Sequence, residues 1–193
     1  MIFDRSEAIK LYTERLYLRL PLPKDYEAWY HLKSLSQNFL KPWEPIWESD
    51  HLTRTIFIKR IKWAKNSVAN NYAFPFFIFS KTDQILLGGI NLDYIRERPS
   101  KSAIVGFWIG EPFARKGYMQ EALQALVHFA FYELDLSRIE ASCLPTNIAS
   151  RGLLEKSGFK YEGVAQSYLE IAGKWQNHVI YANLRSDRRG NVS

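Results

Sequence analysis

A basic loop at the start of an amphipathic segment is the part of this sequence whose residue types point most directly to chemistry. Residues 106–123 pass from an alternating apolar segment, through Arg115 and Lys116, into a helical pattern that begins at Gly117. The first amide groups of a helix have no partner within it, and the helix dipole places partial positive charge at the same end. Together with two cationic side chains, this arrangement predicts a binding site for an anion.

A second helix start follows a strand-like segment within residues 145–159. Asn147 is a favourable N-cap, because its side-chain oxygen can accept a hydrogen bond from the first turn. Ser150 lies three residues further on and therefore on the same face of the helix. The sequence thus predicts an amide and a hydroxyl side chain together at the beginning of this helix.

The composition is that of a globular chain of one domain. The chain has 193 residues, a formal net charge of +6 and one cysteine, Cys143, so it has no internal disulfide. No apolar run approaches the roughly 18–20 residues of a membrane span, and the amino terminus lacks the pattern of a secretion signal. We therefore expect a cytoplasmic protein with no membrane partner and no metal site. The positive charge suits either a polyphosphate ligand or a partner that carries RNA, and charge alone does not separate the two.

Hydrophobic periodicity predicts alternating groups of strands and helices. The expected strands are 15–20, 72–80, 84–93, 102–109, 138–144, 159–171 and 174–184, and the expected helices are 23–35, 52–68, 117–133 and 147–157. The proline-containing segment 39–45 is expected to be a loop, and Leu35 and Trp63 are expected to face the core. This order favours an α+β fold around a mixed sheet. We expect one domain over residues 1–193, with flexible ends at about 1–12 and 186–193.

Four segments in this order resemble the GNAT acetyltransferases, and more narrowly the Rim group of ribosomal-protein N-terminal alanine acetyltransferases. The segments are 38–45, 106–123, 147–159 and 173–179, and the resemblance extends from about residue 13 to residue 184. It implies the GNAT fold, with a mixed, mostly antiparallel sheet that is splayed near its middle and has helices on both faces. It also implies an enzyme that moves an acetyl group from acetyl-CoA to an amine, without a metal.

The resemblance further implies where acetyl-CoA would bind. The pantetheine arm would pair like a strand with the backbone of Phe107, Trp108 and Ile109, and Asn147 would present its amide group to the coenzyme. The pyrophosphate would lie over a loop formed by Arg115, Lys116, Gly117, Tyr118 and Met119. The family pattern Gln/Arg-x-x-Gly-x-Gly/Ala is incomplete, because its first position is Ala114 and its last is methionine. Backbone amides do most of the binding, so the site is still expected.

Two side chains are candidates for the catalytic step. For Ser150, the resemblance implies a hydrogen bond to the departing CoA sulfur, and the alternative is that the hydroxyl is incidental to the helix cap. For Glu44, it implies an acidic group beside the substrate amine, and the alternative is an ordinary surface carboxylate. An α-amine with a pKa of about 7.7–8.0 costs under about 1 kcal/mol to deprotonate near pH 7.4, so a weak base is sufficient.

The acceptor is predicted from the resemblance alone. Trp43, Trp175, Asn177 and His178 would line the entrance for a peptide, although Asn177 stands where many relatives have aspartate and His178 could instead be structural. The predicted acceptor is the N-terminal alanine of a ribosomal protein, with no direct sequence-specific binding of nucleic acid. The alternatives are a small amine such as a polyamine, amino acid or aminoglycoside, and a non-catalytic CoA-binding factor associated with the ribosome.

Overall fold

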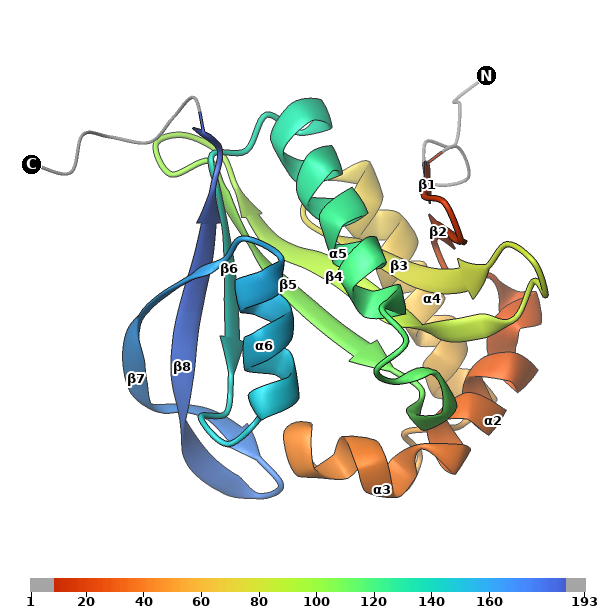
Figure 1. Ribbon diagram of the computed structural model, residues 1–193. Helices are drawn as coiled ribbons and strands as arrows, with labels where there is room; N and C mark the ends of the chain where they lie inside the picture. The colour runs from red at the N-terminus through yellow and green to blue at the C-terminus, as the bar shows by residue number, and fades with distance from the viewer. Residues whose placement is uncertain (1–8, 187–193) are drawn as a thin grey trace, which may run out of the picture.

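The computed structural model describes residues 9–186, and the strands in this range form one eight-stranded sheet (Figure 1). The strands are β1 (Lys10–Tyr12), β2 (Leu16–Arg19), β3 (Phe74–Ser80), β4 (Leu86–Arg96), β5 (Ser102–Ile109), β6 (Arg138–Cys143), β7 (Lys160–Ile171) and β8 (Lys174–Leu184). Their order in the sheet is β1-β2-β3-β4-β5-β6-β8-β7. Three residues of the end expected to be flexible, Lys10–Tyr12, form β1 and pair with β2. Residues 1–8 and 187–193, the outer parts of the two expected ends, lie outside the described residues.

Helices cover both faces of the sheet, which confirms the predicted α+β class. They are α2 (Tyr26–Leu35), α3 (Gln37–Leu40), α4 (Arg54–Ala69), α5 (Tyr118–His128) and α6 (Ile148–Lys156). In Figure 1, α5 and α6 lie in front of the sheet and α4 lies behind it. None of the helices between residues 9 and 186 is both long and apolar enough to cross a membrane.

The sheet opens between β5 and β6, as the resemblance implied. Among the strands of residues 9–186, these two are the only parallel neighbours, and their pairing stops at Ile104 and Glu140. Beyond that point β5 continues to Ile109 beside β4 alone, while β6 continues to Cys143 beside β8. The last part of β5 therefore has a backbone edge without a strand partner, which is what a strand-like ligand needs.

Two local predictions were wrong for reasons of helix geometry. The segment expected to be a loop forms the end of α3 and a 3-10 turn, Lys41–Trp43. Proline fits the first turn of such a helix, because its missing N–H would have no partner there.

The two side chains expected to face the core are exposed instead. Trp63 is 46% exposed and Leu35 is 66% exposed, whereas Phe57 is buried. The inner face of α4 carries apolar residues at spacings of four, three and four residues, and Trp63 lies off this stripe.

Candidate functional site

The basic loop ends in a backbone conformation that favours glycine. Gly117 is the N-cap of α5 and has a φ of +81°, a left-handed value that glycine adopts without steric cost. Arg115 precedes it with a φ of +60°. Arg115, Lys116 and Gly117 are all exposed, and the first amide groups of α5 have no partner within the helix. The loop therefore retains the features from which an anion site was predicted.

Arg15, which the sequence gave no reason to select, supports this loop from the β1–β2 turn. Its Nη1 donates to the carbonyl oxygen of Lys116 at 3.2 Å, and its Nε pairs with Glu121 at 2.7 Å. Its guanidinium also lies 4.7 Å from the ring centroid of Tyr118. About a hundred residues separate these partners in the chain, so no local pattern could have revealed them. Arg15 thus ties the loop to α5, while its charge is paired with Glu121.

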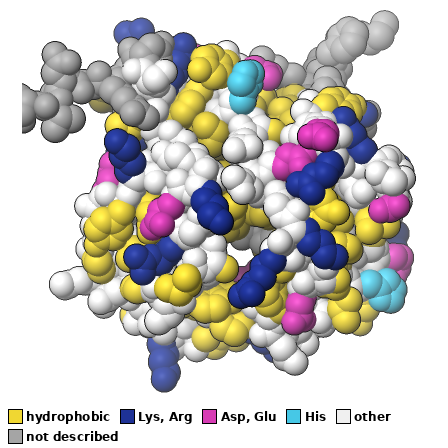
Figure 2. All heavy atoms as spheres, viewed as in Figure 1, with side chains coloured by type: hydrophobic (Ala, Val, Ile, Leu, Met, Phe, Trp, Pro, Cys, Tyr) yellow, Lys and Arg dark blue, Asp and Glu magenta, His cyan; other side chains and the backbone are white. Residues whose placement is uncertain are grey.

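The beginning of α6 faces the same opening as this loop. Figure 2 shows Lys and Arg side chains around a hollow in this face, over the region between α6 and the start of α5. Asn147 caps α6, because its side-chain oxygen accepts from the Ser150 backbone N–H at 3.1 Å, so the predicted N-cap is confirmed. The Ser150 hydroxyl is half-buried and has no hydrogen-bond partner within residues 9–186. It is free to donate to a ligand.

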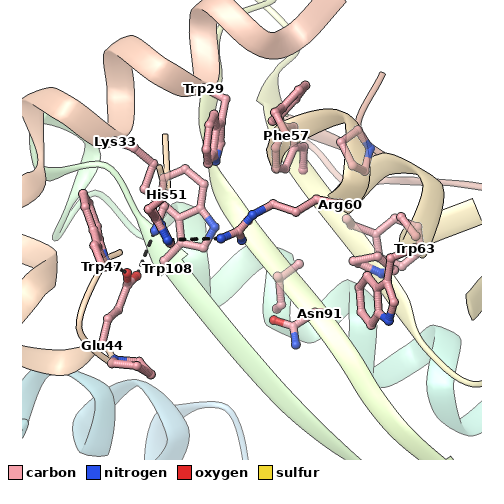
Figure 3. Close-up of a pocket in the computed structure, with 18 of the residues that line it drawn as sticks. Trp29, Lys33, Glu44, Trp47, His51, Phe57, Arg60, Trp63, Asn91 and Trp108 are labelled. Carbon is pink, nitrogen blue, oxygen red and sulfur yellow. Dashed lines mark hydrogen bonds and ion pairs between the residues drawn. The ribbon is translucent and has the colours of Figure 1, made fainter. Parts of the chain in front are cut away.

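A cavity of about 540 Å³ lies on the opposite face of the sheet, between α2, α4, β4 and β5 (Figure 3). Four tryptophans contribute to its walls, namely Trp29, Trp47, Trp63 and Trp108. The polar groups that line it are Lys33, Glu44, His51, Arg60 and Asn91. Since Trp108 belongs to the part of β5 beyond the last pair with β6, the cavity lies beside the opening in the sheet.

Two glycines of β4 allow Trp108 to lie close to this strand, one at its side chain and one at its backbone. A Cβ atom on Gly89 would lie 2.5 Å from the Trp108 Nε1, and one on Gly88 would lie 2.3 Å from the Trp108 carbonyl oxygen. Neither separation is tolerable for a side chain. Gly89 therefore allows the indole to lie against β4 at the cavity, and Gly88 allows the close approach of the β5 backbone.

Glu44 is part of the cavity wall, where the side chains of two other residues hold its carboxylate. Its two oxygens accept hydrogen bonds from the Lys33 Nζ at 2.8 Å and from the Trp47 Nε1 at 2.7 Å. Its carbonyl oxygen accepts from the Ala172 N–H at 3.2 Å, which ties it to the β7–β8 hairpin. Burial lowers the pKa of the Lys33 amine, and the charge of Glu44 opposes that shift.

His51 belongs to the same group of side chains, although the sequence showed no constellation around it. Its ring stacks on Trp47 with centroids 4.7 Å apart, and its Nδ1 lies 3.3 Å from the Arg60 Nη2. Burial, with the nearby charges of Arg60 and Lys33, lowers the pKa of His51 to about 4. His51 is therefore uncharged near neutral pH, and its Nδ1 can accept a hydrogen bond from Arg60.

The four residues expected at a peptide entrance do not line this cavity. Trp43 and Trp175 are exposed, at 38% and 67%. The Asn177 side-chain oxygen accepts from the Ser167 N–H at 2.9 Å within the β7–β8 hairpin. His178 is only 3% exposed, and its Nδ1 lies 3.1 Å from the carbonyl oxygen of Gln176. Of the predicted site residues, the structure thus brings Glu44 and Trp108 together in the cavity and leaves these four outside it.

Comparison with known proteins agrees with this geometry. Residues 15–160 match the family model of the acetyltransferase (GNAT) domain. The chain is 33% identical over 172 residues to the probable N-acetyltransferase YjcK of Bacillus subtilis, and the aligned region covers 89% of this chain and 95% of that protein. It is 32% identical over 176 residues to the ribosomal protein uS5-alanine N-acetyltransferase of Escherichia coli, and the aligned region covers 90% of each of the two proteins. Its fold is similar to that of Mycobacterium smegmatis RimJ in complex with CoA-disulfide, with a TM-score of 0.87, 26% identity and coverage of 95% of this chain and 90% of that one.

The chain therefore belongs to the GNAT acetyltransferase family. It is an acetyl-CoA-dependent N-acetyltransferase, and its relatives include Rim enzymes of the kind that the sequence resembled. Within the described part of the chain, no three His, Cys, Asp or Glu side chains are grouped so that they could hold a metal ion.

Proposed function

We propose that this enzyme acetylates the amino group of a protein N-terminus, with the N-terminal alanine of a ribosomal protein as its preferred acceptor. The observation that carries this proposal is the similarity to an enzyme named for that activity, in an alignment that covers 90% of each chain. The cavity beside the opening in the sheet supports it, because an acceptor there would meet a thioester held at the free edge of β5. We also propose that the enzyme acts in the cytoplasm, where ribosomal proteins are made.

The coenzyme would occupy the opening from the α5 side. We place its pyrophosphate over the loop. There the side chains of Arg115 and Lys116 supply positive charge, and backbone amide groups come from Gly117, Tyr118 and Met119. We place the pantetheine arm along Phe107, Trp108 and Ile109, and the amide of Asn147 against the coenzyme. The unpaired backbone edge of β5 and the exposed loop support this placement.

The acetyl group would pass directly from sulfur to nitrogen. The amine attacks the thioester carbonyl, a backbone N–H near Ile109 stabilises the oxyanion, and the carbon–sulfur bond then breaks. Ser150 donates a hydrogen bond to the departing sulfur, which needs little help because a thiol has a pKa of about 8.5. Glu44 accepts the proton that the amine loses, since each of its oxygens keeps a lone pair after bonding to Lys33 and Trp47.

Replacement of the base should matter most where the amine is protonated. For Glu44→Gln, we expect kcat/KM on an alanine-initiated peptide to fall by about tenfold at pH 8 and about a hundredfold at pH 6.5. Steady-state assays of CoA release across this range measure the ratio. The double variant Lys33→Gln/Glu44→Gln controls for the buried lysine that the single change leaves without its partner. Full recovery of activity in the double variant would show that Glu44 only neutralises Lys33.

The acceptor class can be tested by a product screen. The purified enzyme with acetyl-CoA is offered peptides that differ in their first residue, polyamines and aminoglycosides, and the products are located by mass spectrometry. We expect acetylation at the α-amine of peptides that begin with a small residue such as alanine. Internal lysines should stay largely unmodified, because an amine with a pKa of about 10.4 costs roughly 4 kcal/mol to deprotonate near neutral pH. Acetylated polyamines or aminoglycosides with untouched peptide termini would contradict the proposal.

A further inference from the structure

Arg60 is a cation of the cavity that has no carboxylate partner among residues 9–186. It extends from α4 across the cavity toward His51 (Figure 3), and its Nη2 lies 3.3 Å from the His51 Nδ1, which is its one hydrogen-bond contact within residues 9–186. The side chain remains exposed, and the space it faces is the cavity. Its hydrogen-bonding capacity is therefore largely unused, because a guanidinium carries five N–H donors.

Glu44, the one acidic residue among those that line the cavity, acts on Arg60 through its charge but does not balance both Arg60 and Lys33. The carboxylate of Glu44 is already paired with Lys33 at 2.8 Å and is bonded to Trp47 as well. His51 is neutral near pH 7, so it offers Arg60 an acceptor but no negative charge. The cavity therefore carries one uncompensated positive charge when it contains no ligand.

The walls around Arg60 strengthen an electrostatic contact there. Trp29 lies 5.8 Å below the guanidinium carbon, and Trp63 from the next turn of α4 lines the same space. A ligand bound against these rings would displace water from the guanidinium, and a charge-assisted hydrogen bond gains strength where the local dielectric constant is low. A planar guanidinium is also the donor best shaped to bind a carboxylate or a phosphate through two hydrogen bonds.

We propose that Arg60 selects acceptors that carry an anionic group, a carboxylate or a phosphate, close to the amine that is acetylated. This inference rests on the proposed function, since it takes the cavity as the place where the acceptor binds. On a protein N-terminus the anion is the side chain of an acidic residue shortly after the first residue. On a small acceptor it is an acid group of the same molecule.

Matched acceptors test this preference. The panel contains alanine-initiated peptides with Glu or Gln at position two, three or four, and the α-amides of glutamate and glutamine as small acceptors, because the α-amide removes the carboxylate that both free amino acids share. For the wild-type enzyme, we expect kcat/KM to be about tenfold to a hundredfold higher for the acidic member of at least one pair, as a charge-assisted contact allows. In Arg60→Gln the acid-to-neutral ratio should fall to about one, and in Arg60→Lys it should be partly retained.

Lys62→Gln is the matched control, because it removes the same charge from an exposed position of α4 that does not line the cavity. It should leave the acid-to-neutral ratio unchanged. A loss of folding in Arg60→Gln would lower both members of a pair equally, so the ratio separates selection from structure.

Binding gives a second readout that does not depend on acetyl transfer. The tryptophans of the cavity should report a bound acceptor through a change in their fluorescence, so each pair can be titrated into the enzyme loaded with CoA. If the acidic member binds more tightly to the wild-type enzyme but not to Arg60→Gln, the result supports the inference. This holds even if the peptides are not acetylated, because a lack of acetylation would contradict only the proposed function. Equal rates and equal binding for both members of every pair would overturn the inference.

Discussion

Gly117→Asp should weaken acetyl-CoA binding by at least about a hundredfold, as measured by isothermal titration calorimetry. The new carboxylate would stand at the N-terminus of α5, where the helix dipole and neighbouring cations favour negative charge from the ligand. Its Cβ would lie 3.3 Å from the Arg15 Nη2, so it would also crowd the side chain that supports the loop. Repulsion of the pyrophosphate and disturbance of the loop therefore act in the same direction.

Gly117→Asn is the matched control for this prediction. Asparagine tolerates the left-handed backbone about as well as aspartate, and it has nearly the same shape without the charge. We expect it to bind acetyl-CoA much more tightly than the aspartate variant, with any remaining loss due to backbone strain and crowding. A folded Gly117→Asp protein with wild-type affinity would show that the phosphates bind elsewhere.

Ser150→Ala should lower kcat by about tenfold to a thousandfold while acetyl-CoA affinity stays close to that of wild type. The hydroxyl is expected to act mainly as the sulfur departs, so its removal should raise the barrier without a comparable effect on binding. The cap of α6 should survive, because Asn147 bonds to the backbone N–H of Ser150 and not to its side chain. Single-turnover kinetics and calorimetry measure the two quantities separately.

Ser150→Thr keeps a hydroxyl at the same position and should restore part of the lost turnover. If Ser150→Ala instead weakens acetyl-CoA binding and leaves turnover unchanged, the hydroxyl is a ground-state contact. Its assignment to the departing sulfur would then be wrong.

Both helix starts could be predicted from the sequence because their causes are local. The turn at Gly117 depends on one residue without a side chain, and the cap at Asn147 depends on a bond that spans three residues. The opening of the sheet was predicted from the resemblance, and the pairing of β5 with β6 confirms it.

The cavity could not be predicted in the same way, because its residues come from separate elements. Lys33 from α2, His51 from the following loop and Arg60 from α4 meet only after the helices pack on the sheet. Each has an ordinary local context as a charged or polar residue on an amphipathic segment. Periodicity also misplaced Trp63, whose large apolar side chain suggested the core although it lines an open cavity.

A crystal structure of the protein with acetyl-CoA bound tests the central claim most directly. We predict that the pyrophosphate contacts the loop at Gly117, that the pantetheine arm pairs with the backbone edge of β5 at Phe107–Ile109, and that the sulfur lies within hydrogen-bond reach of the Ser150 hydroxyl. The thioester should face the cavity that contains Glu44 and Trp108. A coenzyme bound outside the opening between β5 and β6, or a thioester directed away from that cavity, would contradict the account.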